Sequence, residues 1–99
     1  MQKLRKIFLL DPPNACSAEL LDLKTDRIMV IIDDNIKFKS DTIDCIFKGD
    51  SANNTGSTTI TVQCKGVWES CSEDNKIILC LLFLSKDKNK IEKIIESIQ

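Results

Sequence analysis

The side chains with which this chain could do chemistry are cysteines, carboxylates and lysines, because it contains no histidine. The absence of imidazole excludes a Ser-His-Asp or Cys-His nucleophile and a histidine metal ligand. Five cysteines cannot all pair within the chain, and their spacing matches no common zinc motif. Several stand among apolar residues, where thiols behave as small hydrophobes. We therefore expect reduced thiols packed in a core, from among Cys16, Cys45, Cys64, Cys71 and Cys80.

No group of residues assembles an active site. Asp33 and Asp34 are adjacent carboxylates that could bind a metal, but neighbouring strand residues point to opposite faces, and Asp-Asp-Asn is typical of a turn. The three glycines are scattered, so no glycine-rich loop can hold a phosphate. A cysteine nucleophile would have no histidine as its base. We predict a protein that is not an enzyme and has no metal site and no cofactor.

Length and charge indicate one small soluble domain over residues 1–99. Of the 99 residues, 42% are apolar and 29% charged, and the net charge is −1, so nothing attracts the whole chain to nucleic acid or anionic lipid. The longest apolar run, Ile77 to Leu84, is far shorter than the roughly 20 residues that cross a bilayer. The apolar run after Lys6 ends at Asp11, too early for a secretion signal. We expect a cytoplasmic protein that neither binds nucleic acid nor inserts into a membrane.

Alternation of apolar and polar residues predicts β-strands along most of the chain. Residues Ile43, Cys45 and Phe47 alternate with polar neighbours, and the pattern returns from Ile60 to Trp68 after a polar loop over 49–57. Two such runs around a turn-rich loop predict a hairpin. The further predicted strands are 20–24, 27–33 and 76–84, the last almost wholly apolar and therefore covered on both faces or closing a barrel.

The two ends of the chain have different patterns. Residues 86–98 carry isoleucines with helical spacing, so they predict a C-terminal helix whose apolar face covers the sheet; the isoleucines are Ile91, Ile94, Ile95 and Ile98. Ser85 or Asp87 could cap its start. At the other end, residues 1–14 form a strand or an arm, ending in a turn over 11–14 that contains two prolines. The fold class is mainly β: a small antiparallel barrel or sandwich with one C-terminal helix.

The second half of the chain resembles the PilZ domain family. The resemblance lies in a strand ending in Val67-Trp68, an apolar strand that reaches Phe83 after a short turn, and the helix over 86–98. In the first half, Ala18 to Leu23 resembles the strand that leads into the family's nucleotide-binding motif. The resemblance implies a six-stranded β-barrel, a fold in which many members bind the bacterial second messenger cyclic di-GMP.

The family's ligand motifs are largely replaced. Members that bind the messenger use an Arg-x-x-x-Arg segment before the barrel and an Asp/Asn-x-Ser-x-x-Gly motif on an early strand. Here Asp22 matches the first position of the second motif, but its serine and glycine positions hold Lys24 and Arg27. Arg5 matches the first arginine, but the residue four positions later is Leu9. Cyclic di-GMP is therefore not the ligand that we favour.

The sequence is compatible with three functions: a protein-binding adaptor, a nucleotide receptor and a structural domain. The first is a PilZ-like adaptor that binds a partner protein in bacterial second-messenger, motility or secretion control. The second is an atypical cyclic di-GMP receptor using Arg5, Asp22, Lys24 and Arg27. The third is a small β-rich oligomerising domain of another family. Trp68, the only tryptophan, either anchors a partner or packs in the core, which its place in the strand favours. The sequence does not set the oligomeric state.

Overall fold

The computed structural model describes residues 4–33, 35–49, 59–68 and 74–98, which form six strands and one helix. The strands are β1 (Leu4–Asp11), β2 (Asn14–Leu23), β3 (Arg27–Asp33), β4 (Thr42–Gly49), β5 (Thr59–Trp68) and β6 (Lys76–Phe83). A 3₁₀ turn (Ser85–Asp87) leads into helix α1 (Lys88–Ile98). The predicted loop over 49–57 lies outside the described residues after Gly49. No helix of the described part is long and apolar enough to cross a membrane.

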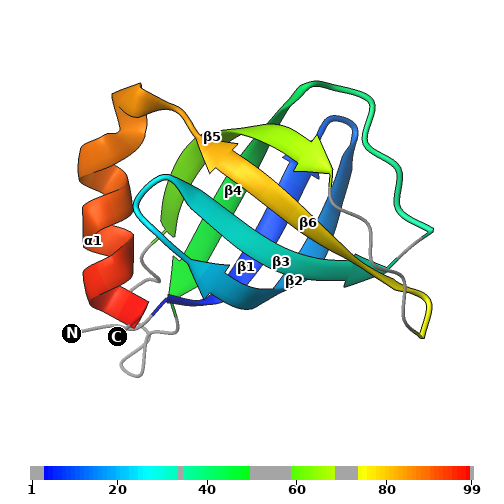
Figure 1. Ribbon diagram of the computed structural model, residues 1–99, viewed down its shortest axis with the longest axis horizontal. Helices are drawn as coiled ribbons and strands as arrows, with labels where there is room; N and C mark the ends of the chain where they lie inside the picture. The colour runs from blue at the N-terminus through cyan, green and yellow to red at the C-terminus, as the bar shows by residue number, and fades with distance from the viewer. Residues whose placement is uncertain (1–3, 34, 50–58, 69–73, 99) are drawn as a thin grey trace.

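The six strands close into an antiparallel barrel in the order β1-β2-β3-β6-β5-β4 (Figure 1). The predicted hairpin is confirmed, because β4 pairs with β5 in a register that sets Cys45 opposite Val62. The N-terminal segment, which the sequence left as a strand or an arm, is strand β1 and closes the barrel by pairing with β4. The predicted class, a small β-barrel with one C-terminal helix, is therefore confirmed.

Period-two alternation explains why these strands build one core. In β4, Ile43, Cys45 and Phe47 are fully buried, while the residues between them are half-buried. Strand β6 is apolar on both faces: Leu79 and Leu81 are buried in the core, and at the alternate positions Cys80 is buried while Ile78 and Leu82 are half-buried. The core is completed by Ile7, Leu9, Ile28, Val30, Ile32, Val62, Cys64, Ile91 and Ile94.

Helix α1 closes one end of the barrel, as Figure 1 shows on the left. Ile91 and Ile94 belong to the core, and Ile95 packs against it. The predicted start at residue 86 is wrong, because Ser85–Asp87 forms a 3₁₀ turn and the helix begins at Lys88. The predicted cap of α1 by Ser85 or Asp87 stays a prediction; the preceding 3₁₀ turn has no side-chain cap, and Asp87 is buried.

Asp87 is buried because it completes the hydrogen bonding of β5. Strand β6 pairs with β5 only from Cys64 onward, so Gln63 has no neighbouring strand on that side. The Asp87 carboxylate accepts the backbone N–H of Gln63 at 3.0 Å. The ammonium groups of Lys86 and Lys90 donate to the Gln63 side chain and to the Thr61 carbonyl. The start of the helical segment thus takes the place of a strand along this edge.

We expect the substitution Ile94→Ala to lower the free energy of unfolding by about 2–5 kcal/mol, because it leaves a cavity between the helix and the barrel. Urea unfolding followed by circular dichroism measures this loss. The adjacent exposed substitution Lys93→Ala is the control and should change stability by less than about 0.5 kcal/mol. Equal effects of the two substitutions would show that the helix does not seal the core.

Candidate functional site

The turn between β2 and β3 brings together three of the five residues singled out in the sequence: Asp22, Lys24 and Arg27. The backbone fixes this turn at two points. The amide of Lys24 donates to the carbonyl of Arg27 at 2.9 Å, and the amide of Phe83 on β6 donates to the carbonyl of Asp26 at 2.9 Å. The turn is thus held against the end of β6, and its charged side chains are exposed to solvent.

The charges of this turn neutralise one another. The Arg27 guanidinium bonds to both oxygens of Asp26, with Nη2 to Oδ2 at 3.0 Å. This bond lowers the pKa of the Asp26 carboxyl and raises the pKa of Arg27. The Lys24 ammonium lies 4.0 Å from Asp22 Oδ2, and Asp22 Oδ1 accepts the amide of Leu23. Two acids and two bases therefore leave no net charge on the turn.

The other two predicted site residues lie at different places in the barrel. Arg5 belongs to β1, which runs antiparallel to β2, so it is at the same end of the barrel as the β2–β3 turn. Leu9, at the position of the second arginine, is fully buried in the core. Trp68 ends β5 and pairs with Leu79 on β6. The side chains of Arg5 and Trp68 lie outside the described part of the structure, so their predicted roles stay predictions.

A shallow pocket of about 290 Å³ lies between the β2–β3 turn and the start of the helical segment. Its apolar lining comes from the end of β6 and from the helix, and its charged lining residues are Asp26 and Lys88. Asp26 is already bonded to Arg27, whereas Lys88 has no ion pair among the described residues. This pocket suits a mainly apolar group and offers little to a dianionic ligand.

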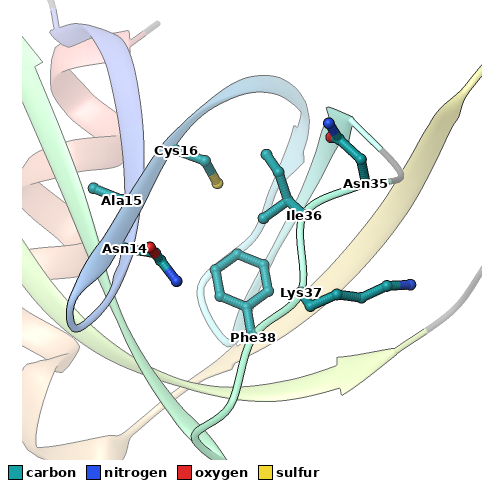
Figure 2. Close-up of a pocket in the computed structure, with 7 residues that line it drawn as sticks. All are labelled: Asn14, Ala15, Cys16, Asn35, Ile36, Lys37 and Phe38. Atoms are coloured by element: carbon teal, nitrogen blue, oxygen red, sulfur yellow. The ribbon is translucent and has the colours of Figure 1, made fainter.

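A second pocket, of about 310 Å³, opens between the start of β2 and the segment that joins β3 to β4 (Figure 2). We call that segment, residues 35–41, the connector. The side chains of Ile36 and Phe38 point from the connector toward β2, whereas Lys37 points away. Cys16 faces them from β2, and burial raises the pKa of its thiol, so it stays protonated. The lining is mixed: apolar side chains alternate with Asn14, Asn35 and Lys37.

Asp11 holds the connector in place, which the sequence did not reveal. Its side chain is only 1% exposed, and its Oδ2 accepts the backbone amides of Lys39 and Ser40. The Ser40 side chain and the Lys39 amide together hold the pKa of the Asp11 carboxyl below its ordinary value. The sequence does carry a signal for the burial of Asp11. It follows Ile7 and Leu9 at every second position of β1, and period two predicts that all three side chains face inward.

The cysteines are core residues, as predicted, and carry no site in the described residues. Cys45, Cys64 and Cys80 are buried, Cys16 is half-buried, and Cys71 lies outside the described part. The Cys64 thiol and burial together raise the pKa of Cys45 well above its ordinary value, so this thiol is protonated and unreactive. Within the described ranges, no cluster of Cys, Asp or Glu could hold a metal ion. The Asp33 turn is also confirmed, since the Ile36 amide donates to the Asp33 carbonyl.

The closed barrel of six antiparallel strands, with a C-terminal helix over one end, is a PilZ-like fold, as the sequence predicted. No protein-family model matches the chain, and a comparison with curated proteins gives no match either. Among solved structures, the chain is similar to the crystal structure of the Borreliella burgdorferi PlzA protein in complex with c-di-GMP. The TM-score is 0.68 at 14% sequence identity, over 96% of this chain and 44% of that chain. This likeness shows the fold, and the chain spans less than half of PlzA.

We expect Asp11→Asn to destabilise the protein at neutral pH, because a neutral amide holds the connector amides less well than a carboxylate. The folded-state pKa of Asp11 is depressed, so its stabilising effect is complete above the ordinary value of 3.8 and is lost as the pH falls through the depressed value. Urea unfolding at several pH values should therefore show a lower free energy of unfolding for the variant than for the wild type at neutral pH, and this difference should vanish in acid.

The exposed substitution Asp41→Asn, two residues beyond the bonded amide of Lys39, is the matched control and should show no such difference. If Asp11→Asn lowers the free energy of unfolding by the same amount at neutral and at acid pH, the charge of Asp11 does not hold the connector, and the loss comes from packing alone.

Proposed function

We propose that this chain is a non-enzymatic signalling domain with a PilZ-like fold that acts by binding a partner protein. The observation that carries the proposal is the β2–β3 turn, whose acids and bases pair with one another. In the PilZ resemblance this turn would hold the cyclic dinucleotide, a ligand with two phosphates. A turn with no net charge gives such a ligand little electrostatic attraction.

The positions of individual residues support the same proposal. The planar guanidinium of Arg27 suits phosphate or a guanine face, but it is already engaged by Asp26. Arg27 also places a long side chain where the motif has glycine, which would leave room for the ligand. Leu9, at the place of the second arginine, lies inside the barrel, so no small change of conformation supplies a second guanidinium there. The described residues thus keep the barrel, while the guanidinium of Arg27 is paired and the position of the second arginine is apolar.

A second candidate is an atypical receptor for cyclic di-GMP, and one observation favours it. The pocket of about 290 Å³ lies directly beside the turn that carries Asp22, Lys24 and Arg27, and Lys88 lines it. PlzA, which shares the fold, was crystallised with c-di-GMP. Binding in this mode would require Arg27 to leave Asp26, an exposed ion pair of the kind that typically contributes less than about 1 kcal/mol.

A titration with cyclic di-GMP separates the two candidates. We expect isothermal calorimetry to give no saturable heat under conditions that would reveal a Kd of about 10 µM, because the turn offers no net positive charge. The receptor candidate predicts instead a saturable heat that weakens at least about tenfold in Arg27→Ala and in Arg5→Ala, with Lys93→Ala unchanged. Such a result would replace our proposal with the receptor function.

A further inference from the structure

The side of β3 and β6 that faces away from the core is apolar. Alternation places Ile28, Val30 and Ile32 of β3 in the core, so the residues between them face outward. The outward residues of the two strands stand opposite one another in four rows: Arg27 with Leu82, Met29 with Cys80, Ile31 with Ile78, and Asp33 with Lys76. We call these four rows the outer face. Its charges lie only at its two ends, and the rows between them are wholly apolar.

The neighbouring strands show what a water-facing side of this barrel contains. On β5 the positions that alternate with the core-facing residues are Thr59, Thr61, Gln63 and Lys65, none of them apolar. On β4 the outward positions hold one apolar residue, Ile46. An antiparallel strand with one side in water alternates apolar and polar residues. The outer face breaks this rule on two adjacent strands, which is typical of a surface that another protein surface covers.

No described element of this chain covers the outer face. Helix α1 packs on β1 and β5 at one end of the barrel. In Figure 1, β3 and β6 run in front of β1 and β4, and nothing in the described part lies in front of them. Leu21, in the bulge of β2 next to β3, is 47% exposed and enlarges the apolar surface. The occupant of this surface therefore comes from outside the described residues.

The order of the rows makes the outer face complementary to itself. Consider a two-fold axis that runs between β3 and β6, parallel to both strands: it lays β3 of one copy over β6 of the other, row upon row. Each row then meets its own counterpart: Met29 lies against Cys80, Ile31 against Ile78, and Asp33 against Lys76. Apolar rows thus meet apolar rows. Two sheets packed in this way have nearly aligned strands, as in a β-sandwich.

The charges around the outer face fit the same axis. Asp33 and Lys76 form an ion pair at 2.7 Å, so two copies bring four charges of alternating sign together. At the other end Arg27 is neutralised by Asp26 and repels no second copy. An acid and a base placed on either side of the axis are what an isologous interface requires. This match favours a second copy over an unrelated apolar partner.

The two flanks of the outer face have opposite signs. Glu19 is exposed on β2 beside Ile31, and Lys65 is exposed on β5 beside Leu82. Neither forms an ion pair within the described ranges. The two-fold axis sets β2 of one copy on the side of β5 of the other, so an acidic flank faces a basic one. Opposite potentials on facing surfaces favour association.

We propose that two copies of this chain form a dimer by packing their outer faces together about this axis. The apolar side chains of the face are half-buried or buried already, so the area that the dimer hides is small and its affinity is modest. The dimer goes beyond the proposed adaptor function and does not rest on it, because neither the β2–β3 turn nor a partner protein is needed to form it.

Sedimentation equilibrium of the whole chain, with its thiols kept reduced, tests the proposal. We expect a dimer whose share rises with protein concentration below about 1 mM. Ile78→Asp places a charge in the middle of the outer face and should raise the dissociation constant at least about tenfold. Ile46→Asp makes the same change on the outward side of β4, across the barrel, and should leave the constant unchanged. Circular dichroism checks that both variants fold.

A charge exchange tests the axis without touching the apolar rows. Lys76→Glu gathers four carboxylates in the dimer and should raise the dissociation constant at least about tenfold. Adding Asp33→Lys to it restores alternating signs and should return the constant to within about threefold of the wild type. Lys93→Glu on α1 changes the net charge by the same amount and is the control, with no effect expected.

A monomer at every concentration up to about 1 mM would overturn the dimer. Equal effects of Ile78→Asp and Ile46→Asp would overturn the outer face as its interface, and a double variant that stays as weak as Lys76→Glu would overturn the axis. None of these results bears on the adaptor function, which the cyclic di-GMP titration tests separately.

Discussion

The structure depends on one constraint: the backbone N–H and C=O groups at strand edges must find partners where neighbouring strands end. Two buried carboxylates meet part of this demand, Asp87 from the helical segment and Asp11 from the end of β1. Asp87 accepts the amide of Gln63 where β6 stops covering β5. Asp11 accepts two amides of the connector where β3 has already ended. These bonds tie the helical segment and the connector to the barrel, which otherwise holds itself together by ladder pairing and a core of aliphatic side chains and thiols.

The same constraint positions the residues that line the two larger pockets. Because Asp87 fixes the start of the helical segment beside β5, the pocket near the β2–β3 turn is bounded by Ser85 and Lys88. Because Asp11 fixes the connector, Ile36 and Phe38 stand opposite β2 and leave the other pocket between them. Each pocket is thus positioned by a carboxylate that lies outside it, and substitutions at Asp11 would reach the pocket beside the connector indirectly.

The sequence predicted the parts of the fold in which a local pattern repeats. Alternation over β4 and β5 and the isoleucine spacing of α1 were enough to predict the hairpin, the helix and the barrel class. The first half of β2 was missed, because Asn14 to Ala18 are small or polar and follow two prolines, so no apolar period marks them. The predicted turn after Asp11 is confirmed, but the hydrogen bonds of the two buried carboxylates were not predictable, since their bonding partners lie more than twenty positions away. The grouping of Asp22, Lys24 and Arg27 on one turn was predictable from spacing, but their neutralisation through Asp26 required geometry.

A closed barrel removes nearly all strand edges; in the described residues the start of β5, which the helical segment covers at Gln63, and the start of β2 lack a neighbouring strand on one side. Hydrogen-bonding groups that remain unpaired in water cost little, so an open edge survives only where no aggregation follows from it. At the start of β2 the edge is short, carries the small side chain of Ala15, and faces the connector across a pocket. Such an arrangement leaves few unpaired backbone groups to which the edge of another barrel could bond.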